Sequence, residues 1–434
     1  MLVLTILSGL VLAFNPPPKK SATLTYWTFA KPHYDSYVKI LPEFEREHPG
    51  VKVDLQLVTN TGLPQRLQAA FQADLDVPDL CEIEISSAGT FFRGPLEHVG
   101  FADLTDRIHK DGLLDKMVAA RFAPYTKKGH IFGLPHDVHP VMLTYNRELF
   151  EKEGIDPNSI QTWDDFIRVG KKITIPHKRY MAEMVSTGTD EYEICLFQRG
   201  GAFFDANGNL TMDNDIAVKT MEFYVPLVAE GSKNQVAGSL SSSFGSVIVQ
   251  GLQDQYFACL FTPDWRTGGL QQDAGAMAGK LAVMPLPAVE PGGRRTSTWG
   301  GTMLGITRHC QNQDLAWELA KFLYLDEKAL PDRFRTTNII PPVKHSWQLP
   351  VFHEERPFWS NQRIGEQFIA LADQVPGQYS SPYIDTAKGK STEALISCVK
   401  YYEHHGDDGF DAFVRSELKA RADEVRRQIA RNPY

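Results

Sequence analysis

The chain has 434 residues, of which 42% are hydrophobic and 23% are charged, and its formal net charge at pH 7 is -8. This composition is typical of a soluble globular protein, and the length favours two or more packed units over a single core. Lysine and arginine form no run along the chain, which excludes the usual electrostatic signature of nucleic-acid binding.

The N-terminal segment, Met1 to Phe14, is apolar and is followed by three prolines, Pro16 to Pro18. It is shorter than the roughly 20 residues that cross a bilayer as a helix, but it has the length of the apolar part of a secretion signal. Since no Lys or Arg precedes it and no A-x-A cleavage site follows, an uncleaved anchor stays open. We predict that residues 1–21 form a signal-like segment with a proline-rich linker. The protein is then periplasmic or extracellular, with membrane tethering as an alternative.

The residues after these prolines alternate between strand and helix patterns. The predicted elements are strands at 22–29, 51–58 and 77–85, and helices at 34–48 and 64–73. The first helix stops at Pro49-Gly50, which is a strong turn signal. Strands that alternate with helices in this way predict an α/β fold with crossover helices.

The middle of the chain changes character at residues 131–150, where two prolines interrupt strand-like pieces. Such a segment fits a crossing between domains better than a central strand. Thr162 is placed to cap a helix over 162–172, and Gly200 to Gly208 resembles a hairpin bracketed by turns. Further helices are predicted at 216–230, 315–325, 365–373, 391–404 and 411–430.

The segment from Phe261 to Leu325 is the most informative part of the sequence. It places Trp265 in a turn rich in Pro and Gly, between Thr262 and Gly269, and then a strand at 281–287. A glycine-rich loop with Trp299 follows, and then a short apolar strand and an amphipathic helix. Aromatic faces and exposed backbone amides at loop tips suit the binding of a small polar molecule better than its conversion.

The sequence carries no recognisable metal or cofactor motif, and we predict neither. HExxH, P-loop and GxSxG patterns are missing from it. His136 and His139 stand three apart on a strand and would face opposite ways. The five cysteines are widely spaced, so either one or two long-range disulfides or buried free thiols are compatible with the pattern.

Short motifs follow one another along the chain in a characteristic order. They are Leu41 to Val51 (LPEFEREHPGV), Pro78 to Leu80, Gly133 to Pro135, Leu143 to Arg147, Thr162 to Phe166 (TWDDF), Gly200-Gly201, Trp265, Pro285 to Pro287, Gly300-Gly301 and Ala316-Trp317 through Phe322-Leu323. In this order they resemble the family 1 extracellular solute-binding proteins of ABC importers, the group typified by maltose-binding protein. The resemblance spans nearly all of residues 22–345.

The resemblance implies a type II periplasmic-binding-protein fold, in which hinge crossovers join two α/β lobes and the ligand binds in the cleft between them. The N-terminal lobe would hold residues 22–135 and 280–328, and the C-terminal lobe residues 136–279 and 329–434. It further implies a monomeric binding protein that captures a carbohydrate, either a mono- or an oligosaccharide, and delivers it to an ABC permease without catalysing a reaction.

Three tryptophans are the leading candidates for the ligand site. Trp265 aligns with a stacking aromatic of the family, and Trp299 with Gly300 and Gly301 resembles the family's loop whose backbone amides reach the ligand. Trp27 ends the first predicted strand, where ligands collect in open α/β sheets, although a core position is the competing interpretation.

Polar candidates are less distinctive. Asp79 opens a predicted strand, where its carboxylate would accept sugar hydroxyls or cap a turn, and Tyr145 follows the crossover, where a core position is the alternative. Glu82 and Glu84 share one face of the same strand, which is more often a solvated face. Trp347 and Trp359 are weaker candidates, to line the second lobe.

Other functions stay open on the sequence alone. A glycoside hydrolase would need two carboxyl groups facing each other across a cleft, and acidic residues are abundant enough to supply them. A polyamine-binding protein would need several inward carboxylates, and a ferric-ion-binding protein would need clustered tyrosines.

Overall fold

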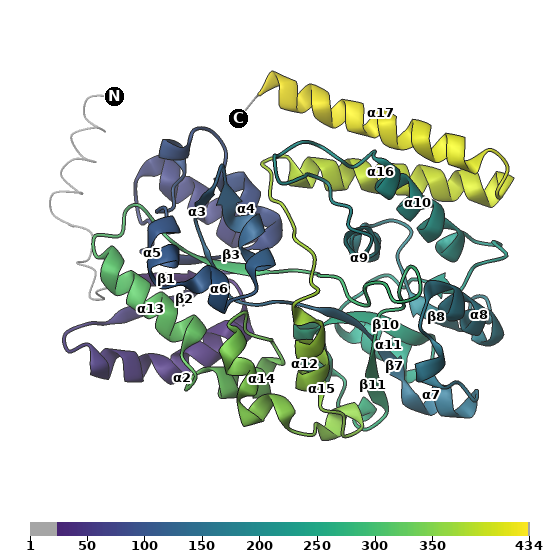
Figure 1. The fold of residues 1–434 in the computed structure, drawn as a ribbon, viewed down its shortest axis with the longest axis horizontal. Helices are drawn as coiled ribbons and strands as arrows, with labels where there is room; N and C mark the ends of the chain where they lie inside the picture. The colour runs from purple at the N-terminus through teal and green to yellow at the C-terminus, as the bar shows by residue number, and fades with distance from the viewer. Residues whose placement is uncertain (1–23, 433–434) are drawn as a thin grey trace, which may run out of the picture.

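The computed structural model describes residues 24–432, so the predicted signal-like segment at 1–21 lies outside the described residues. Two halves lie side by side, each built around its own five-stranded sheet (Figure 1). Within residues 24–432 we find no helix with the length and apolarity needed to span a membrane.

The N-terminal lobe is built on a sheet with the strand order β2-β1-β3-β12-β6. These strands are β1 (Leu24–Thr28), β2 (Val53–Leu57), β3 (Leu80–Glu84), β6 (Leu134–Pro135) and β12 (Thr302–Ile306). The strands β1, β2 and β3 pair in parallel, whereas β12 runs antiparallel to β3. The predicted alternation of strand and helix is confirmed here, since α2 (Lys31–Glu47) and α3 (Gly62–Ala73) connect the parallel strands.

The C-terminal lobe is built on a sheet with the strand order β11-β7-β10-β8-β9. These strands are β7 (Val141–Asn146), β8 (Tyr180–Glu183), β9 (Ala237–Gly238), β10 (Phe257–Pro263) and β11 (Leu281–Pro285). All residues of β7 and β10 are buried, as expected for central strands covered on both faces. The lobe boundary predicted at residue 280 differs from this pairing, because β11 pairs with β7 and the chain rejoins the first sheet only at β12.

Helices cover both sheets, and periodicity explains which face each one buries. In α2 the buried residues His33, Ser36, Tyr37, Leu41 and Phe44 recur three or four apart, so they form one stripe against the sheet. The helix at Thr162 begins with the predicted cap, because the Thr162 hydroxyl and the Asp165 carboxylate form a reciprocal capping box. The predicted hairpin near Gly200 is reduced to an isolated bridge between Phe204 and Leu210.

The remaining elements connect or flank the two sheets. The other helices are α4 (Ile85–Phe91), α5 (Thr105–Lys110), α6 (Leu113–Lys116), α7 (Arg147–Lys152), α8 (Trp163–Ile173), α9 (Asp190–Gln198), α10 (Asp215–Val228), α11 (Gly245–Gln253), α12 (Asp264–Asp273), α13 (Gln313–Leu325), α14 (Leu330–Thr337), α15 (Ile364–Ala372), α16 (Ile384–His405) and α17 (Phe410–Arg431). Short 3₁₀ helices lie at Leu96–His98, Ala119–Tyr125, Pro157–Ser159, Gly275–Met277, Lys344–Gln348, Pro350–His353 and Pro357–Trp359, and β4 (Thr126–Lys127) pairs with β5 (His130–Ile131).

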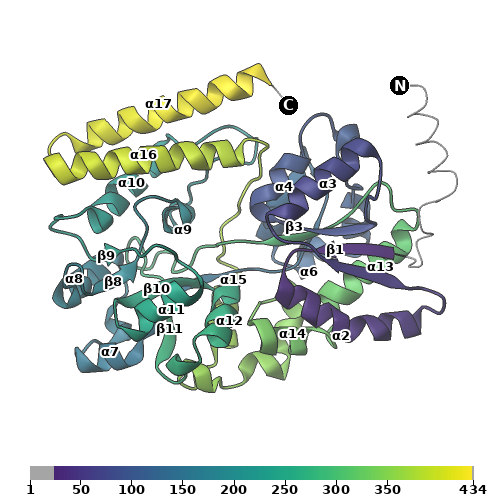
Figure 2. The same ribbon diagram turned by 180° about the vertical axis from the view of Figure 1, so that it is seen from behind.

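Three segments cross between the lobes. The first joins β6 to β7 through residues 136–140, the second joins β11 to β12, and the third follows α14, which itself contacts both α2 and α12. The connection from α15 to α16 also runs between the two halves, and α16 and α17 flank the C-terminal lobe (Figure 2). A cavity between the lobes lies where these crossings meet.

The five cysteines are buried free thiols, so the disulfide alternative left open by the sequence is not realised in this fold. Burial raises the pKa of each of three of them, Cys195, Cys310 and Cys398, to about 12. We therefore expect thiol titration with a disulfide-exchange reagent to detect five thiols in denaturant and almost none in native protein. A reductant should leave the melting temperature unchanged; a fall of several degrees would reveal a stabilising disulfide.

Candidate functional site

A cavity of about 500 Å³ lies between the lobes, within the range of small-molecule sites. After β1 the N-terminal lobe contributes Phe29, Ala30, Pro32 and His33, and at the end of β3 it contributes Glu84 to Ser86. These are the carboxyl ends of parallel strands, where open α/β sheets bind ligands. The C-terminal lobe contributes α9, α12 and the loop before α11. We refer to this space as the interlobe cavity.

Three aromatic side chains form one wall of the interlobe cavity. The Trp265 and Trp299 rings lie 5.4 Å apart between centroids and are inclined at 64°, and Phe244 lies 6.2 Å from Trp265 and 5.9 Å from Trp299. The two indoles are half-buried, whereas Phe244 is 46% exposed. We refer to Phe244, Trp265 and Trp299 as the aromatic wall.

The aromatic wall is supported from the protein side by Arg266. Its guanidinium carbon lies 5.3 Å from the centroids of both the Phe244 and the Trp299 rings, and its charge is paired with Glu183 at 2.9 Å. A cation close to aromatic rings is attracted by their electron-rich faces. Because Arg266 is almost fully buried, it helps to fix the orientation of the rings.

Trp265 occupies the first turn of α12, which corrects the prediction that it lies in a loop. Helix propensity is a weak signal, and the glycines at 268 and 269 masked the helix in the sequence. The Trp265 indole N–H donates to the Trp299 carbonyl at 3.0 Å. Since this hydrogen bond occupies the polar edge of the ring, Trp265 can offer a ligand only its apolar surface.

Gly300 and Gly301 lie beside the aromatic wall, and their lack of a side chain is required by protein contacts. Gly300 has a left-handed φ of 83°, a conformation that glycine adopts readily. A Cβ on Gly301 would lie 2.3 Å from the Arg121 guanidinium nitrogen. The structure thus brings Trp265, Trp299, Gly300 and Gly301 together at the interlobe cavity, as predicted.

Trp27, Asp79 and Tyr145 do not line the interlobe cavity, contrary to prediction. Trp27 is 2% exposed, and its ring is covered by the Arg66 guanidinium at 3.8 Å. Asp79 precedes β3, so it lies at the amino end of that strand, where it accepts hydrogen bonds from the Thr25 amide and hydroxyl.

Tyr145 is equally remote from the cavity, because it packs in the core of β7 with its ring centroid 4.7 Å from that of Phe150. The weaker candidates Trp347 and Trp359 are also buried in the core, at 7% and 0% exposure. The competing core interpretation therefore describes Trp27 and Tyr145, and the two weaker candidates are core residues as well.

A buried histidine holds the crossing segments together. His139 Nδ1 contacts Asp264 at 2.5 Å, and His139 Nε2 contacts Asp137 at 3.1 Å. All three side chains are at most 5% exposed. Burial alone would lower the pKa of His139, but the two carboxylates outweigh burial and raise it to about 9. His139 is therefore a cation at neutral pH.

Each partner of His139 extends this network to another crossing segment. Asp264 accepts hydrogen bonds from the Ile340 and Trp265 amides, both at 2.7 Å. Asp137 is paired with Arg121 at 3.1 Å, and Arg121 donates to the carbonyl of Gly300 at 3.0 Å. All three crossings are thus connected by four side chains, which we refer to as the hinge cluster: His139, Asp137, Asp264 and Arg121.

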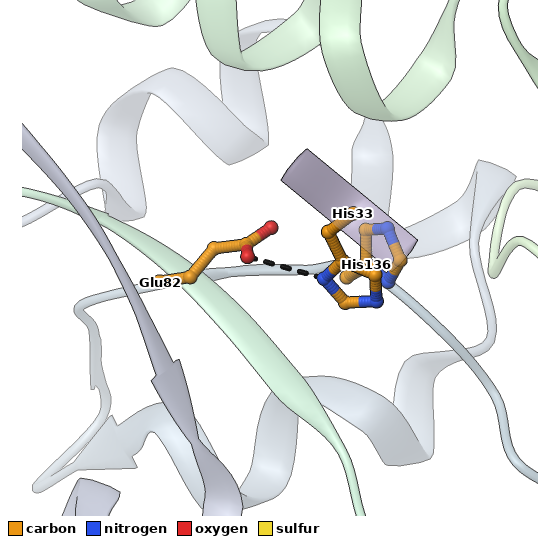
Figure 3. A group of neighbouring side chains, drawn as sticks. All are labelled: His33, Glu82 and His136. Carbon is orange, nitrogen blue, oxygen red and sulfur yellow. Dashed lines mark hydrogen bonds and ion pairs between the residues drawn. The ribbon is translucent and has the colours of Figure 1, made fainter. Parts of the chain in front are cut away.

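A second buried cluster lies in the N-terminal lobe, where His33, Glu82 and His136 gather (Figure 3), and its member His33 also lines the interlobe cavity. These are ligand types that suit zinc, and their potential ligand atoms lie within 4.8 Å of one another. Sequence analysis missed the group because its members come from α2, β3 and the first crossing. No local pattern connects such distant positions.

Both oxygens of Glu82 already accept hydrogen bonds. Oε1 accepts from the hydroxyls of Tyr37 at 2.6 Å and Tyr324 at 2.7 Å, and Oε2 from Thr28 and from His33 at 3.1 Å. A metal ion would have to replace this set, so the donors present favour a structural anchor over a metal centre. Burial alone would raise the pKa of Glu82, but the neighbouring His33 leads the groups that lower it, so Glu82 is a carboxylate.

Carboxyl groups from both lobes reach the interlobe cavity. Glu84 accepts a hydrogen bond from the Ser86 amide at 2.8 Å and so caps α4. Glu193 is paired with Lys388 at 2.8 Å and accepts from Thr189 at 2.9 Å. Burial raises the pKa of both carboxyl groups, although Lys388 opposes this rise at Glu193. An aromatic wall therefore shares the cavity with charged hydrogen-bonding groups.

Residues 30–329 match the family of bacterial extracellular solute-binding proteins. The chain belongs to this family. Membership confirms the resemblance drawn from the motifs, and it agrees with the predicted location outside the cytoplasm.

Curated relatives support the same assignment, and a solved structure has the same fold. The arabinooligosaccharide-binding proteins of Bacillus subtilis and Halalkalibacterium halodurans are 29% and 28% identical to this chain over 409 and 390 residues. These matches cover 92% and 88% of this chain and 93% and 85% of the relatives. The sugar-binding protein MalE from Xanthomonas citri has a TM-score of 0.76 at 18% identity, covering 95% of this chain and 100% of its own. The two-lobed fold is thereby confirmed.

Several cavity residues of this solute-binding protein were missed by sequence analysis. They are Phe29, His139, Asp190, Glu193, Phe244, Gln272, Gln378 and Lys388. Phe244 stands in a Ser/Gly loop, and a lone large aromatic in such a loop is a usable signal. The others lie on helices or on connections between elements, where only the tertiary fold shows which side chains face the cavity.

The hinge cluster predicts a specific pH dependence. The folded pKa of His139, about 9, lies above its ordinary value of 6.5, so its contribution to stability is complete below pH 6.5 and is lost as pH rises through 9. The shift corresponds to about 3 kcal/mol. Denaturant unfolding at pH 6 and pH 10 measures how much stability each protein loses over this interval. The His139→Asn variant should lose about 3 kcal/mol less than wild type. Equal losses in the two proteins would contradict the raised pKa of His139. Asn is chosen for this position because it tolerates the left-handed φ of 57°.

The hydrogen bonds accepted by the buried Glu82 carboxylate can be tested by substitution. Glu82→Gln keeps the shape but places an amide NH₂ where donors converge, so the free energy of unfolding should fall by about 3 kcal/mol. The matched control is Glu97→Gln, which changes an exposed glutamate of the same lobe and should alter stability by less than about 0.5 kcal/mol. Denaturant titration measures both variants. Similar small effects would show that the buried carboxylate is dispensable.

Proposed function

We propose that this protein captures a carbohydrate in the interlobe cavity and delivers it to the membrane subunits of an ABC importer. The observation that carries the proposal is that the aromatic wall and charged groups line the same cavity. A sugar ring has apolar C–H faces and a belt of hydroxyl groups. Aromatic rings cover the faces, and carboxylates, amides and ammonium groups bind the hydroxyls.

Energetic considerations support a site with several rings. A micromolar ligand requires about 8 kcal/mol, whereas burying one ring face of roughly 50 Å² contributes only about 1 to 1.5 kcal/mol. Stacking on Trp265 and Trp299 therefore needs charge-assisted hydrogen bonds in addition. Glu84 from the N-terminal lobe and Asp190 and Lys388 from the C-terminal lobe are placed to supply them.

The proposed ligand is an oligosaccharide, because the two relatives that align over most of this chain are named for arabinooligosaccharides. The protein acts as a monomer whose N-terminal lobe, residues 24–135 and about 302–328, closes against the rest about the three crossings. Hinge closure of this kind buries the ligand in bacterial binding proteins. It is exported, and residues 1–21 either direct export or tether it.

Binding without hydrolysis completes the proposal. Glu84 and Glu193 lie on opposite lobes, as a hydrolase would require, but Glu84 caps a helix and Glu193 is paired with Lys388. A thermal-shift screen should show stabilisation by arabino-, xylo- or galacto-oligosaccharides, since a bound ligand stabilises the fold by mass action. Release of nitrophenol from a nitrophenyl arabinofuranoside would instead support a hydrolase, and stabilisation by polyamines or ferric ion alone would overturn the proposal.

Substitution of Trp265 separates its stacking role from its hydrogen bond. Trp265→Ala removes the ring face and should weaken saccharide binding more than tenfold, with the melting temperature close to wild type. Trp265→Phe keeps an aromatic face but removes the N–H that contacts Trp299, so it should retain most of the affinity. Isothermal titration measures both. Equal affinity of the alanine variant and wild type would remove Trp265 from the ligand site.

A further inference from the structure

A second cavity of about 800 Å³ lies on the other side of a narrow partition from the interlobe cavity. Its walls also come from both lobes, including Phe92 and Phe122 of the N-terminal lobe and Phe204 and Tyr383 of the C-terminal lobe. Between the two large cavities is a space of only about 30 Å³, which has room for roughly two or three water molecules. A sugar ring cannot pass through such a space.

The partition is formed by residues that line neighbouring cavities at once. The interlobe cavity and the small space share the lining residues Ile85, Ser86, Glu193, Gln378 and Lys388. The small space and the second cavity share Tyr379 and Ser380. Because only the small space lies between the two large cavities, the interlobe cavity is closed to a sugar ring at this end.

The closed end presents hydrogen-bonding groups rather than an apolar surface. Lys388 uses one N–H on Glu193 at 2.8 Å, and an ammonium group has three such donors. The Gln378 side-chain oxygen is buried and has no hydrogen-bond partner. Buried acceptors are normally paired with a donor, so a ligand hydroxyl at this position would satisfy the amide oxygen.

The segment that carries Gln378 is held firmly against the N-terminal lobe. It belongs to the connection from α15 to α16, which runs between the two halves (Figure 2). Gly89 of α4 lies so close to this connection that a Cβ there would approach the Ser381 carbonyl oxygen to 2.2 Å. The end of the cavity is thus a fixed feature of the packed structure.

We propose that Gln378, Lys388 and Glu193 form an end wall that binds the hydroxyl groups of the terminal sugar, so that the protein selects oligosaccharides by a chain end. This inference rests on the proposed carbohydrate function. The opposite arrangement, a continuous groove that binds internal residues of a polymer, would need an open passage at this partition.

The test compares tetrasaccharides with linear polymers of the same sugar. Arabinotetraose, xylotetraose and galactotetraose are titrated against the full chain, each alongside linear arabinan, xylan or galactan. For the tetrasaccharide that binds, an end-selective site predicts that the matching polymer competes in proportion to its number of chain ends, and so at least tenfold more weakly per unit mass. Equal competition per unit mass would overturn the end wall while leaving carbohydrate binding intact. Failure of every saccharide to bind would overturn both proposals.

Variants test the residue assignment independently. Gln378→Ala should weaken tetrasaccharide binding at least fivefold without lowering the melting temperature. Gln374→Ala, an exposed glutamine just after α15 in the same connection, is the matched control and should bind as wild type does. Unchanged affinity in Gln378→Ala would show that this side chain does not contact the ligand.

Discussion

A buried imidazolium held between two carboxylates is the interaction on which the rest of the structure depends. His139 lies on the first crossing, and its partners Asp137 and Asp264 bind the other two crossings through Arg121 and through the Ile340 amide. A buried charge is stable only when it is paired and hydrogen-bonded. The pairing therefore fixes where the three segments meet, and the lobes must move about this point.

The same interaction positions the ligand site. Asp264 is the first residue of α12 and directly precedes Trp265, whereas Arg121 holds the carbonyl of Gly300, directly after Trp299. Each indole of the aromatic wall thus lies next in sequence to a residue that belongs to the hinge cluster or is hydrogen-bonded to it. Lobe movement and the position of the stacking surface are connected, because the backbone at or beside each indole is hydrogen-bonded to a member of the hinge cluster.

Much of the fold could be predicted from the sequence because its signals are local. The alternation of strands and helices up to β3, the cap at Thr162 and the order of motifs all survive in the structure. The strand β11 was assigned to the wrong lobe because a short apolar strand does not reveal its pairing partner, and β7 is remote in sequence.

Part of the candidate site could be predicted because unusual residues mark it in the local sequence. The residues that were missed reach the site only through the tertiary fold. Trp265 and Trp299 stood out because each stands in a segment rich in Gly and Pro, whereas Trp27 and Tyr145 belong to strands buried on both faces. Asp79 was misplaced because it precedes β3, and ligands gather at the other end of parallel strands, where Glu84 lies. Glu82 looked like a solvated residue, but hydrogen-bonding residues from β1, α2 and α13 surround it.

A crystal structure of the protein with a bound oligosaccharide tests the central claim most directly. The account predicts a sugar ring against the faces of Trp265 and Trp299, with His139 still in contact with both Asp137 and Asp264. Density for the sugar away from these indoles, or a His139 separated from Asp264 in the closed complex, would contradict it.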